Sequence, residues 1–188
     1  EELMAGEKAE HFGNIHRTFE DGERLVTTPP YTAYLKIAEG CSNGCAFCII
    51  PKLRGRYRSR SMEALLAEAR QLADSGVKEL IVIAQDITRY GMDLEEPTSL
   101  AGLLKELCKL DFHWIRLHYL YPEVITDELI DTIAREKKIV HYLDIPIQHC
   151  NDGILKAMRR RNTRAELEDL FDRLRRAIPD LVVRTSLI

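Results

Sequence analysis

The sequence has 188 residues, with 27 Lys or Arg against 30 Asp or Glu, and 45% of its residues are hydrophobic. This length suits one domain rather than two, and the apolar fraction can build a core, which excludes wholesale disorder. No apolar run approaches the roughly 18–20 residues that cross a bilayer, and a formal net charge of −3 excludes a general attraction to nucleic acid.

The first thirty residues differ from the rest, because they are rich in acidic residues and show little apolar periodicity. They end at the stiff pair Pro29-Pro30, so we expect residues 1–30 to be a linker or the remnant of a preceding domain. The sequence opens Glu1-Glu2-Leu3 without the features of a signal peptide, and we expect it to be a piece of a longer protein. Residues 31–188 then form one incomplete core domain.

From residue 31 onward, extended and helical patterns alternate, which is typical of a parallel sheet with crossover helices. We expect strands at Tyr34–Ala38, Glu79–Ala84, Trp114–Tyr119, His141–Ile145 and Leu181–Ile188. Such units build a barrel or a doubly wound sheet, and a complete eight-unit barrel takes about 250 residues. Five units cannot close one. The predicted fold is therefore an α/β open partial barrel with a parallel sheet, truncated at its C-terminal side.

The segments between the strands carry helix start and stop signals. Candidate N-caps are Ser61, Thr98 or Ser99, Thr126, and Thr163, which has the spacing of a capping box with Glu166. The first of these helices should end at Ser75 before Gly76, and the last should reach Ala177. The second helix turns one apolar face inward, formed by Leu100, Leu103, Leu104, Leu107 and Cys108.

Three of the five cysteines lie in one short loop after the first predicted strand. The run Gly40-Cys41-Ser42-Asn43-Gly44-Cys45-Ala46-Phe47-Cys48 has the spacing C-x3-C-x2-C, and its glycines let the backbone wrap tightly. An odd cysteine count is a poor disulfide framework, so ligation in a reducing cytoplasm fits better. A cubane iron–sulfur cluster takes four thiolates, and three are local here. One iron is then open to a substrate or cofactor.

Two other interpretations of this loop compete. One is a structural zinc site with His149 or Cys150 as a distant fourth ligand, although such sites usually offer paired C-x2-C units and only Cys45 and Cys48 form one. The other is a set of three core cysteines without a ligand.

The loop and two later stretches resemble the radical S-adenosylmethionine superfamily, and within it the methylthiotransferases. The similar residues are Gly40 to Pro51, followed by Arg54-Gly55 and Arg58-Ser59-Arg60. The stretches Ala84-Gln85-Asp86-Ile87-Thr88-Arg89-Tyr90-Gly91 and Ile145-Pro146-Ile147-Gln148-His149 are similar to the RimO type, which methylthiolates an aspartate of a ribosomal protein. The resemblance covers about Tyr31 to Ile188.

This resemblance implies a role for each residue of the loop. Cys41, Cys45 and Cys48 would hold a 4Fe–4S cluster, and S-adenosylmethionine would chelate its open iron while Phe47 lies near the adenine. An electron donor would reduce the cluster, and one electron would split the cofactor into methionine and a 5′-deoxyadenosyl radical that abstracts hydrogen. The product would be a methylthio group on an aspartate of a small-subunit ribosomal protein, with Ile49 to Pro51 keeping water from the cluster.

The family also has an N-terminal domain with a second cluster and a small C-terminal substrate-binding domain, which this sequence lacks. The resemblance therefore implies that this portion alone is limited to cleaving S-adenosylmethionine or is inactive. Two rival functions stay open: a tRNA adenosine methylthiotransferase, and a non-catalytic zinc-binding scaffold associated with the ribosome.

Polar residues at alternate strand positions predict a charged cavity. Lys36, Arg116, His118, Asp144 and Arg184 lie opposite the aliphatic residues of their strands, on the face that lines the lumen of a barrel. At the carboxyl-end rim, we expect contacts with the cofactor. The predicted cofactor-binding residues are Phe47, Gln85, Asp86, Arg116, Gln148 and Arg184, and no catalytic side chain is assigned beyond the cluster ligands. His149 and Asn151 lie on the same rim, and Asn151 could equally cap a helix.

Further charges and thiols receive simpler interpretations. Lys52, Arg54, Arg56, Arg58 and Arg60 form a basic loop that could contact ribosomal RNA or an acidic protein, neutralise the cluster or the cofactor carboxylate, or be solvated. The run Arg159-Arg160-Arg161 complements a helix dipole and needs no further role. Cys108 is expected in the core, and a buried thiol is favoured for Cys150.

Overall fold

A computed structural model describes residue 6, residues 14–15 and residues 26–188. The predicted linker over residues 1–30 lies mostly outside these described residues. The strands are β1 (Thr32–Lys36), β2 (Ala38–Glu39), β3 (Arg58–Ser59), β4 (Glu79–Ile83), β5 (Trp114–Leu117), β6 (Ile139–Asp144) and β7 (Val182–Arg184). The helices are α1 (Ile50–Arg54), α2 (Met62–Asp74), α3 (Leu100–Leu107), the 3-10 turn η1 (Pro122–Val124), α4 (Asp127–Arg135), α5 (Asp152–Ala157) and α6 (Arg164–Ala177). In this part of the chain, no helix is both long and apolar enough to span a membrane.

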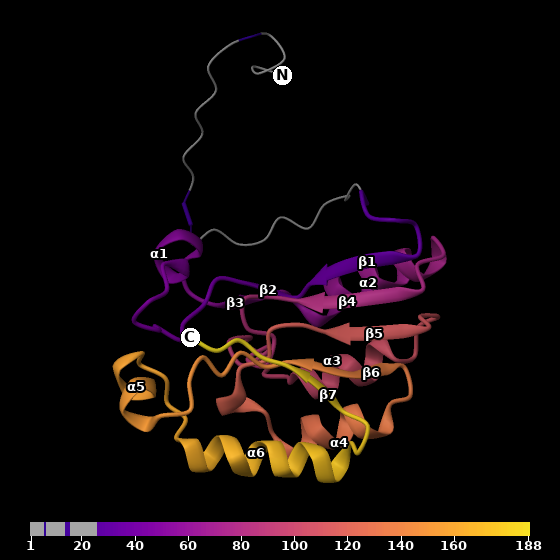
Figure 1. The fold of residues 1–188 in the computed structure, drawn as a ribbon. Coiled ribbons are helices and arrows are strands. Elements are labelled where there is room, and N and C mark those ends of the chain that lie inside the picture. The colour runs from indigo at the N-terminus through magenta and orange to yellow at the C-terminus, as the bar shows by residue number, and fades with distance from the viewer. Residues whose placement is uncertain (1–5, 7–13, 16–25) are drawn as a thin grey trace.

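Five strands form one parallel sheet in the order β1-β4-β5-β6-β7, which is their order in the sequence. A doubly wound sheet reverses direction at a switch point, whereas a barrel adds each strand beside the preceding one. The observed order is therefore that of a barrel wall, as predicted. In Figure 1 the strands point toward one end of the sheet, where α1 and α5 also lie.

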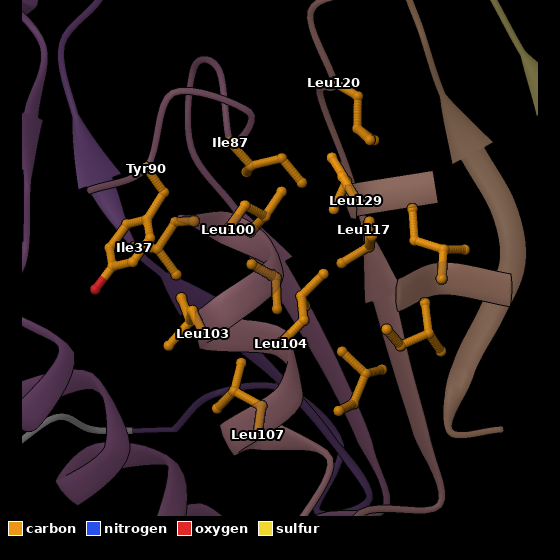
Figure 2. Packing of buried hydrophobic residues seen from close by; sticks show 14 of the residues in the cluster. Ile37, Ile87, Tyr90, Leu100, Leu103, Leu104, Leu107, Leu117, Leu120 and Leu129 are labelled. Carbon is orange, nitrogen blue, oxygen red and sulfur yellow. The ribbon is translucent and has the colours of Figure 1, made fainter. Parts of the chain in front are cut away.

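The helices cover one face of the sheet and leave the other uncovered by the described residues. Leu35 of β1, Val82 of β4 and Leu117 of β5 are fully buried against the helices, whereas Tyr34 and Trp114 on the opposite face are 43% and 47% exposed. Figure 2 shows the leucines of α3 in one cluster with buried residues of the strands and loops. The predicted alternation of apolar and polar residues along the strands thus corresponds to side chains that point in turn into the core and onto the open face of the sheet.

The helix signals are confirmed. The side chains of Ser61, Ser99 and Thr126 accept hydrogen bonds from the first turns of α2, α3 and α4. Thr163 and Glu166 form the predicted capping box at the start of α6. The apolar face predicted for α3 is buried as a whole.

The strand boundaries differ from the prediction at both ends of the sheet. The first strand starts two residues earlier, and after Ile37 the chain leaves the sheet to pair β2 with β3 in a separate antiparallel ribbon. The predicted last strand keeps only Val182–Arg184, followed by an isolated bridge between Gln148 and Leu187. The chain leaves the sheet early after Ile37 and after Arg184, and both places lie at the carboxyl end of the sheet, where loops rather than strand neighbours determine the path of the backbone.

Candidate functional site at the carboxyl end of the sheet

The cysteine loop, defined as residues 40–48, follows β2 and lies at the carboxyl end of the sheet. The loops that follow β4, β5 and β6 reach the same end, since the strands are parallel (Figure 1). In (βα) folds, this end carries the functional residues because each strand delivers its following loop to the same place. The structure therefore brings the predicted motifs together although they are far apart in the sequence.

The start of the cysteine loop is held by close backbone contact with the chain after α1. Gly40 has a φ of +78°, and a Cβ atom there would stand 2.2 Å from the carbonyl oxygen of Arg56. The amide of Cys41 donates to the carbonyl of Gly55 over 3.2 Å, and Ser42 Oγ accepts from the amide of Tyr57 over 3.1 Å. A glycine is thus required at position 40 both by conformation and by space.

The middle of the loop is held by a polar network. Asn43 Nδ2 donates to Asp86 Oδ2 over 2.9 Å, and Asn43 Oδ1 accepts from Nε of Arg89 over 2.8 Å. Asp86 is fully buried, forms an ion pair with Arg89, and accepts from the amide and hydroxyl of Thr88. Asp86 therefore anchors the cysteine loop to the loop after β4, a structural role that the cofactor-binding prediction did not include.

The end of the loop contacts the connection between α5 and α6. The amide of Ala46 donates to the carbonyl of Met158 over 3.0 Å. Cys45 Sγ lies 3.3 Å from the hydroxyl of Tyr121 and 3.9 Å from NH1 of Arg160, which stacks over the Tyr121 ring at 3.9 Å from its centroid. One of the three thiols thus has two polar side chains directed at it.

The three thiols share this loop, and each is half-buried. Across the described ranges, no three His, Cys, Asp or Glu side chains are grouped closely enough to form a ready-made metal site. Burial raises the pKa of Cys41, and the nearby Cys45 and Cys48 add to this rise. The sulfurs therefore lie within electrostatic range of one another.

The donor set fits an iron–sulfur cluster in its chemistry. Three soft thiolate donors on a glycine-containing loop suit such a cluster, and metal binding generally draws its ligands together because it is coupled to folding. A buried cation beside Cys45 further suits a site that becomes anionic on ligation.

Three of the predicted cofactor-binding residues, Phe47, Gln85 and Gln148, lie at this end, and the first two have groups that are open to a ligand. Phe47 is 52% exposed, and Gln85 has a buried Oε1 without a hydrogen-bond partner among the described residues. Gln148 has a φ of +70°, and Tyr119 and Arg159 are the other described non-glycine residues with positive φ. Such conformations cost on the order of 1–3 kcal/mol each and concentrate at functional sites.

The charged face of the strands is present, but its charges are largely paired with each other. Nε of Arg116 donates to Glu79 over 2.7 Å, and NH1 of Arg184 donates to Asp144 over 2.8 Å. Lys36 is paired with Glu39. Among the described residues, no direct contact joins Arg116 or Arg184 to the cysteine loop, so their predicted contact with the cofactor stays a prediction.

His118, which shares this face, contacts the aromatic rings of Tyr119 and Tyr142. Partial burial lowers the pKa of His118. This shift favours the neutral imidazole, so His118 adds less positive charge to the face than the sequence implied.

The distant fourth ligands of the zinc hypothesis are not gathered with the cysteines. His149 Nδ1 accepts from the amide of Asn151 over 2.9 Å. Cys150 is exposed, so the prediction of a buried thiol is wrong there, whereas Cys108 is buried as predicted. Asn151 Oδ1 caps α5 by accepting from two amides of its first turn, which supports the capping alternative.

The basic loop is only partly available to an anion. Arg60 forms an ion pair with Glu68 over 2.6 Å, and Arg54 lies 3.7 Å from Glu39. Arg58 donates to the carbonyls of Arg54 and Arg56, which folds its guanidinium back onto the loop. Lys52 and Arg56 are exposed. The predicted five-cation surface is thus reduced to a few outward side chains.

Sequence reasoning missed four residues that hold the loop: Asn43, Arg89, Tyr121 and Arg160. Arg160 was assigned no role beyond the helix dipole, and that prediction is wrong because its side chain is buried beneath the loop. A usable signal existed for Asn43 and Arg89, since both lie within the motifs that carry the family resemblance. Nothing in the local sequence distinguishes Arg160 from its two neighbouring arginines.

Sequence comparison finds bacterial relatives named ribosomal protein uS12 methylthiotransferase RimO. The protein from Caldanaerobacter subterraneus subsp. tengcongensis is 53% identical over 188 residues, which cover 99% of this chain and 43% of that protein. The protein from Pelobacter propionicus is 58% identical over 166 residues, covering 88% of this chain and 37% of that protein. The chain thus spans about two fifths of the length of these relatives.

Solved structures with a similar fold are radical S-adenosylmethionine enzymes. TsrM from Kitasatospora setae, a methyltransferase solved with tryptophan and a cofactor analogue, gives a TM-score of 0.65 at 15% identity, covering 87% of this chain and 33% of that chain. OxsB, solved with aqua-cobalamin and S-adenosylmethionine, gives 0.63 at 15% identity, covering 82% of this chain and 23% of that chain. The sequence model of the radical SAM superfamily matches residues 35–188. The chain belongs to the radical SAM superfamily.

Proposed function

We propose that this chain is the radical core of a methylthiotransferase that modifies an aspartate of the ribosomal protein uS12. The observation that carries the proposal is the loop of three thiols, held at the carboxyl end of a barrel-type sheet by contacts at its start, middle and end. The names and identities of the relatives support the specific reaction and substrate. A ribosomal substrate in turn implies a cytoplasmic location.

In this proposal, Cys41, Cys45 and Cys48 hold a 4Fe–4S cluster with one iron open to S-adenosylmethionine. When bound, the cluster supplies the electron that cleaves the sulfonium of this cofactor, and it needs an electron donor to do so. The protein positions the reactants and excludes water. Gln85 Oε1, which lacks a partner among the described residues, is available to the cofactor amine or ribose, and the exposed ring of Phe47 is available to its adenine.

The loop contacts give the site its rigidity. Tethers from Asn43 to Asp86 and from Ala46 to Met158 fix both sides of the central cysteine. We infer that residues 31–188 form the core domain and that the first thirty residues connect it to another part of a longer protein.

Anaerobic reconstitution of the chain with iron and sulfide tests the cluster. We expect about four iron and four sulfide per chain and visible absorption that bleaches on reduction, since only one loop offers three thiolates. Cys45→Ala should lose the colour, whereas Cys108→Ala, which removes a buried thiol elsewhere, should keep it. Stoichiometric zinc without iron would instead support the non-catalytic scaffold.

The activity needs a second experiment on the full-length protein. With S-adenosylmethionine and reductant, the loaded protein should release 5′-deoxyadenosine and add a methylthio group to uS12, detectable by mass spectrometry. Modification of an adenosine in tRNA, with uS12 unchanged, would contradict the proposed substrate and favour the tRNA methylthiotransferase.

The outward charges of the basic loop are candidates for contact with ribosomal RNA. Lys52 and Arg56 are exposed and have no ion pair within the described chain. Charge reversal at both positions should weaken binding to ribosomal RNA and make it less sensitive to salt. In a plot of the logarithm of the binding constant against the logarithm of the salt concentration, the slope should become shallower by about 0.7–0.9 for each phosphate contact that is lost. Charge reversal at Lys137 in the turn before β6 is the matched control, and an equal loss there would contradict a specific contact.

A further inference from the structure

Among the described residues, Arg160 is a buried cation without an acidic partner. Its side chain lies in the connection between α5 and α6, and the residue is only 7% exposed. NH2 donates to the carbonyl of Pro146 over 2.7 Å, NH1 lies 3.9 Å from Cys45 Sγ, and Nε has no hydrogen-bond partner in the part of the chain that the structure describes. Within the described residues, no carboxylate forms an ion pair with it.

A buried guanidinium is costly unless an anion compensates it, because transfer of a charge from water into a protein interior is strongly unfavourable. Here the group is held by a carbonyl, by the face of the Tyr121 ring at 3.9 Å from its centroid, and by a sulfur. The carbonyl and the ring are neutral. The sulfur of Cys45 is the one atom among these three partners that can carry a full negative charge.

Tyr121 joins the arginine to the same sulfur. Its ring supports the guanidinium, and its hydroxyl lies 3.3 Å from Cys45 Sγ. Toward a thiolate, the hydroxyl is the donor. Two side chains that contact each other therefore direct their polar hydrogens at one sulfur atom.

The three cysteines differ in the hydrogen-bond donors that reach their sulfur atoms. Cys41 receives a hydrogen bond from the backbone of Asn43 rather than from a side chain. Among the described residues, side-chain donors reach Cys45 and not the thiols of Cys41 or Cys48. The chemistry around Cys45 is that of a preformed anion-binding position.

We propose that Arg160 and Tyr121 are positioning residues whose charge and hydrogen bond at the sulfur of Cys45 stabilise the extra negative charge of the reduced cluster. This inference rests on the proposed function, because it assumes that Cys45 is a cluster ligand. Hydrogen bonds to cluster sulfurs and nearby positive charge raise the reduction potential, since they favour the more negative oxidation state. The pair thus makes the cluster easier to reduce.

The experiment is a redox titration of the reconstituted chain, followed by electron paramagnetic resonance. At the midpoint potential of the wild type, Tyr121→Phe should lower the ratio of reduced to oxidised cluster by about fivefold, as expected for one net hydrogen bond. Arg160→Leu should lower it further, because both a donor and a charge are lost. Arg160→Lys keeps the charge without the stack and should fall between the wild type and Arg160→Leu.

Tyr90→Phe is the matched control, since it removes a buried hydroxyl that has no hydrogen-bond partner, and its potential should equal that of the wild type. Iron content and thermal unfolding of the metal-free chains show whether each variant folds and loads. Loaded Tyr121→Phe and Arg160→Lys variants with wild-type potentials would overturn the inference while leaving the proposed function intact. A wild-type chain that takes up no cluster would overturn the proposed function itself.

Discussion

Asn43 of the cysteine loop and Asp86 of the loop after β4 lie 43 residues apart in the sequence, yet their side chains are joined by a hydrogen bond of 2.9 Å. Asp86 is fully buried, and Arg89 contacts both partners. The position of the loop is therefore tied to the neighbouring (βα) unit. Substitutions at Asp86 should disturb both the stability of the fold and the geometry of the thiols.

Asp86→Ala should lower the free energy of unfolding by about 3–5 kcal/mol, because it breaks a buried ion pair and leaves the Asn43 amide without its acceptor. Arg89 then keeps only Glu123, 3.7 Å away, as an acidic partner. Asp86→Asn keeps the shape and should cost about 1–3 kcal/mol. Urea denaturation measures both values. Asp74→Asn at the exposed end of α2 is the control and should change the value by less than about 0.5 kcal/mol. Equal effects at Asp74 and Asp86 would refute the anchoring role.

Gly40→Ala should be far more damaging than Gly44→Ala. Both glycines have positive φ, +78° and +68°, but a Cβ at Gly40 would overlap the carbonyls of Arg56 and Gly55, whereas Gly44 has open space. We expect about 1–2 kcal/mol of destabilisation at Gly44 from conformation alone, and a larger loss at Gly40. Guanidinium denaturation and iron uptake of the two variants provide the comparison. Similar losses would show that the close approach at Gly40 is not important.

The capping box of α6 should make stability depend on pH in the acidic range. Hydrogen bonds from the amide and hydroxyl of Thr163 hold the pKa of Glu166 below its usual value. Because the folded pKa is depressed, the stabilisation is fully present above the unfolded pKa, about 4.3, and is lost as the pH falls through the folded value. Glu166→Gln should therefore differ from the wild type in unfolding free energy at pH 6, with the difference shrinking toward pH 3. A constant difference would contradict the capping interaction.

The two cysteines outside the cysteine loop should differ strongly in reactivity. Burial raises the pKa of the Cys108 thiol to about 12, so at pH 8 only about one part in 10⁴ is thiolate. Cys150 is exposed. Iodoacetamide followed by peptide mass spectrometry should label Cys150 quickly and Cys108 only after unfolding in guanidinium. Rapid labelling of native Cys108 would mean that α3 does not pack as described.

Local sequence signals predicted most of the framework. Helix starts depend on one capping side chain and a few neighbouring residues, so Ser61, Ser99, Thr126 and Thr163 could be identified from the sequence. The parallel barrel-type sheet followed from the repeated (βα) pattern. The short ribbon of β2 and β3 was missed because two-residue strands carry no periodicity and depend on contacts between distant segments.

The residues proposed as cluster ligands could be named from the sequence, whereas the residues that hold the cysteine loop in place could not. The cysteines are recognisable because metal ligation demands particular residue types at close spacing. The supports are ordinary residues whose function comes from tertiary position: Tyr121 follows β5, and Arg160 is one of three consecutive arginines. Asp86 was predicted as a cofactor-binding residue, whereas its complete burial and its hydrogen bonds show that it supports the cysteine loop.

The contact between Cys45 and Arg160 spans 115 residues, whereas each strand of the five-stranded sheet pairs with the preceding strand of that same sheet. During synthesis the sheet can therefore grow one (βα) unit at a time. The cysteine loop is made early, but the residues that contact its end are made much later. Arg160 leaves the ribosome only after four of the five strands have been made. The cysteine loop thus reaches its final environment late in the assembly of the chain, after most of the scaffold around it already exists.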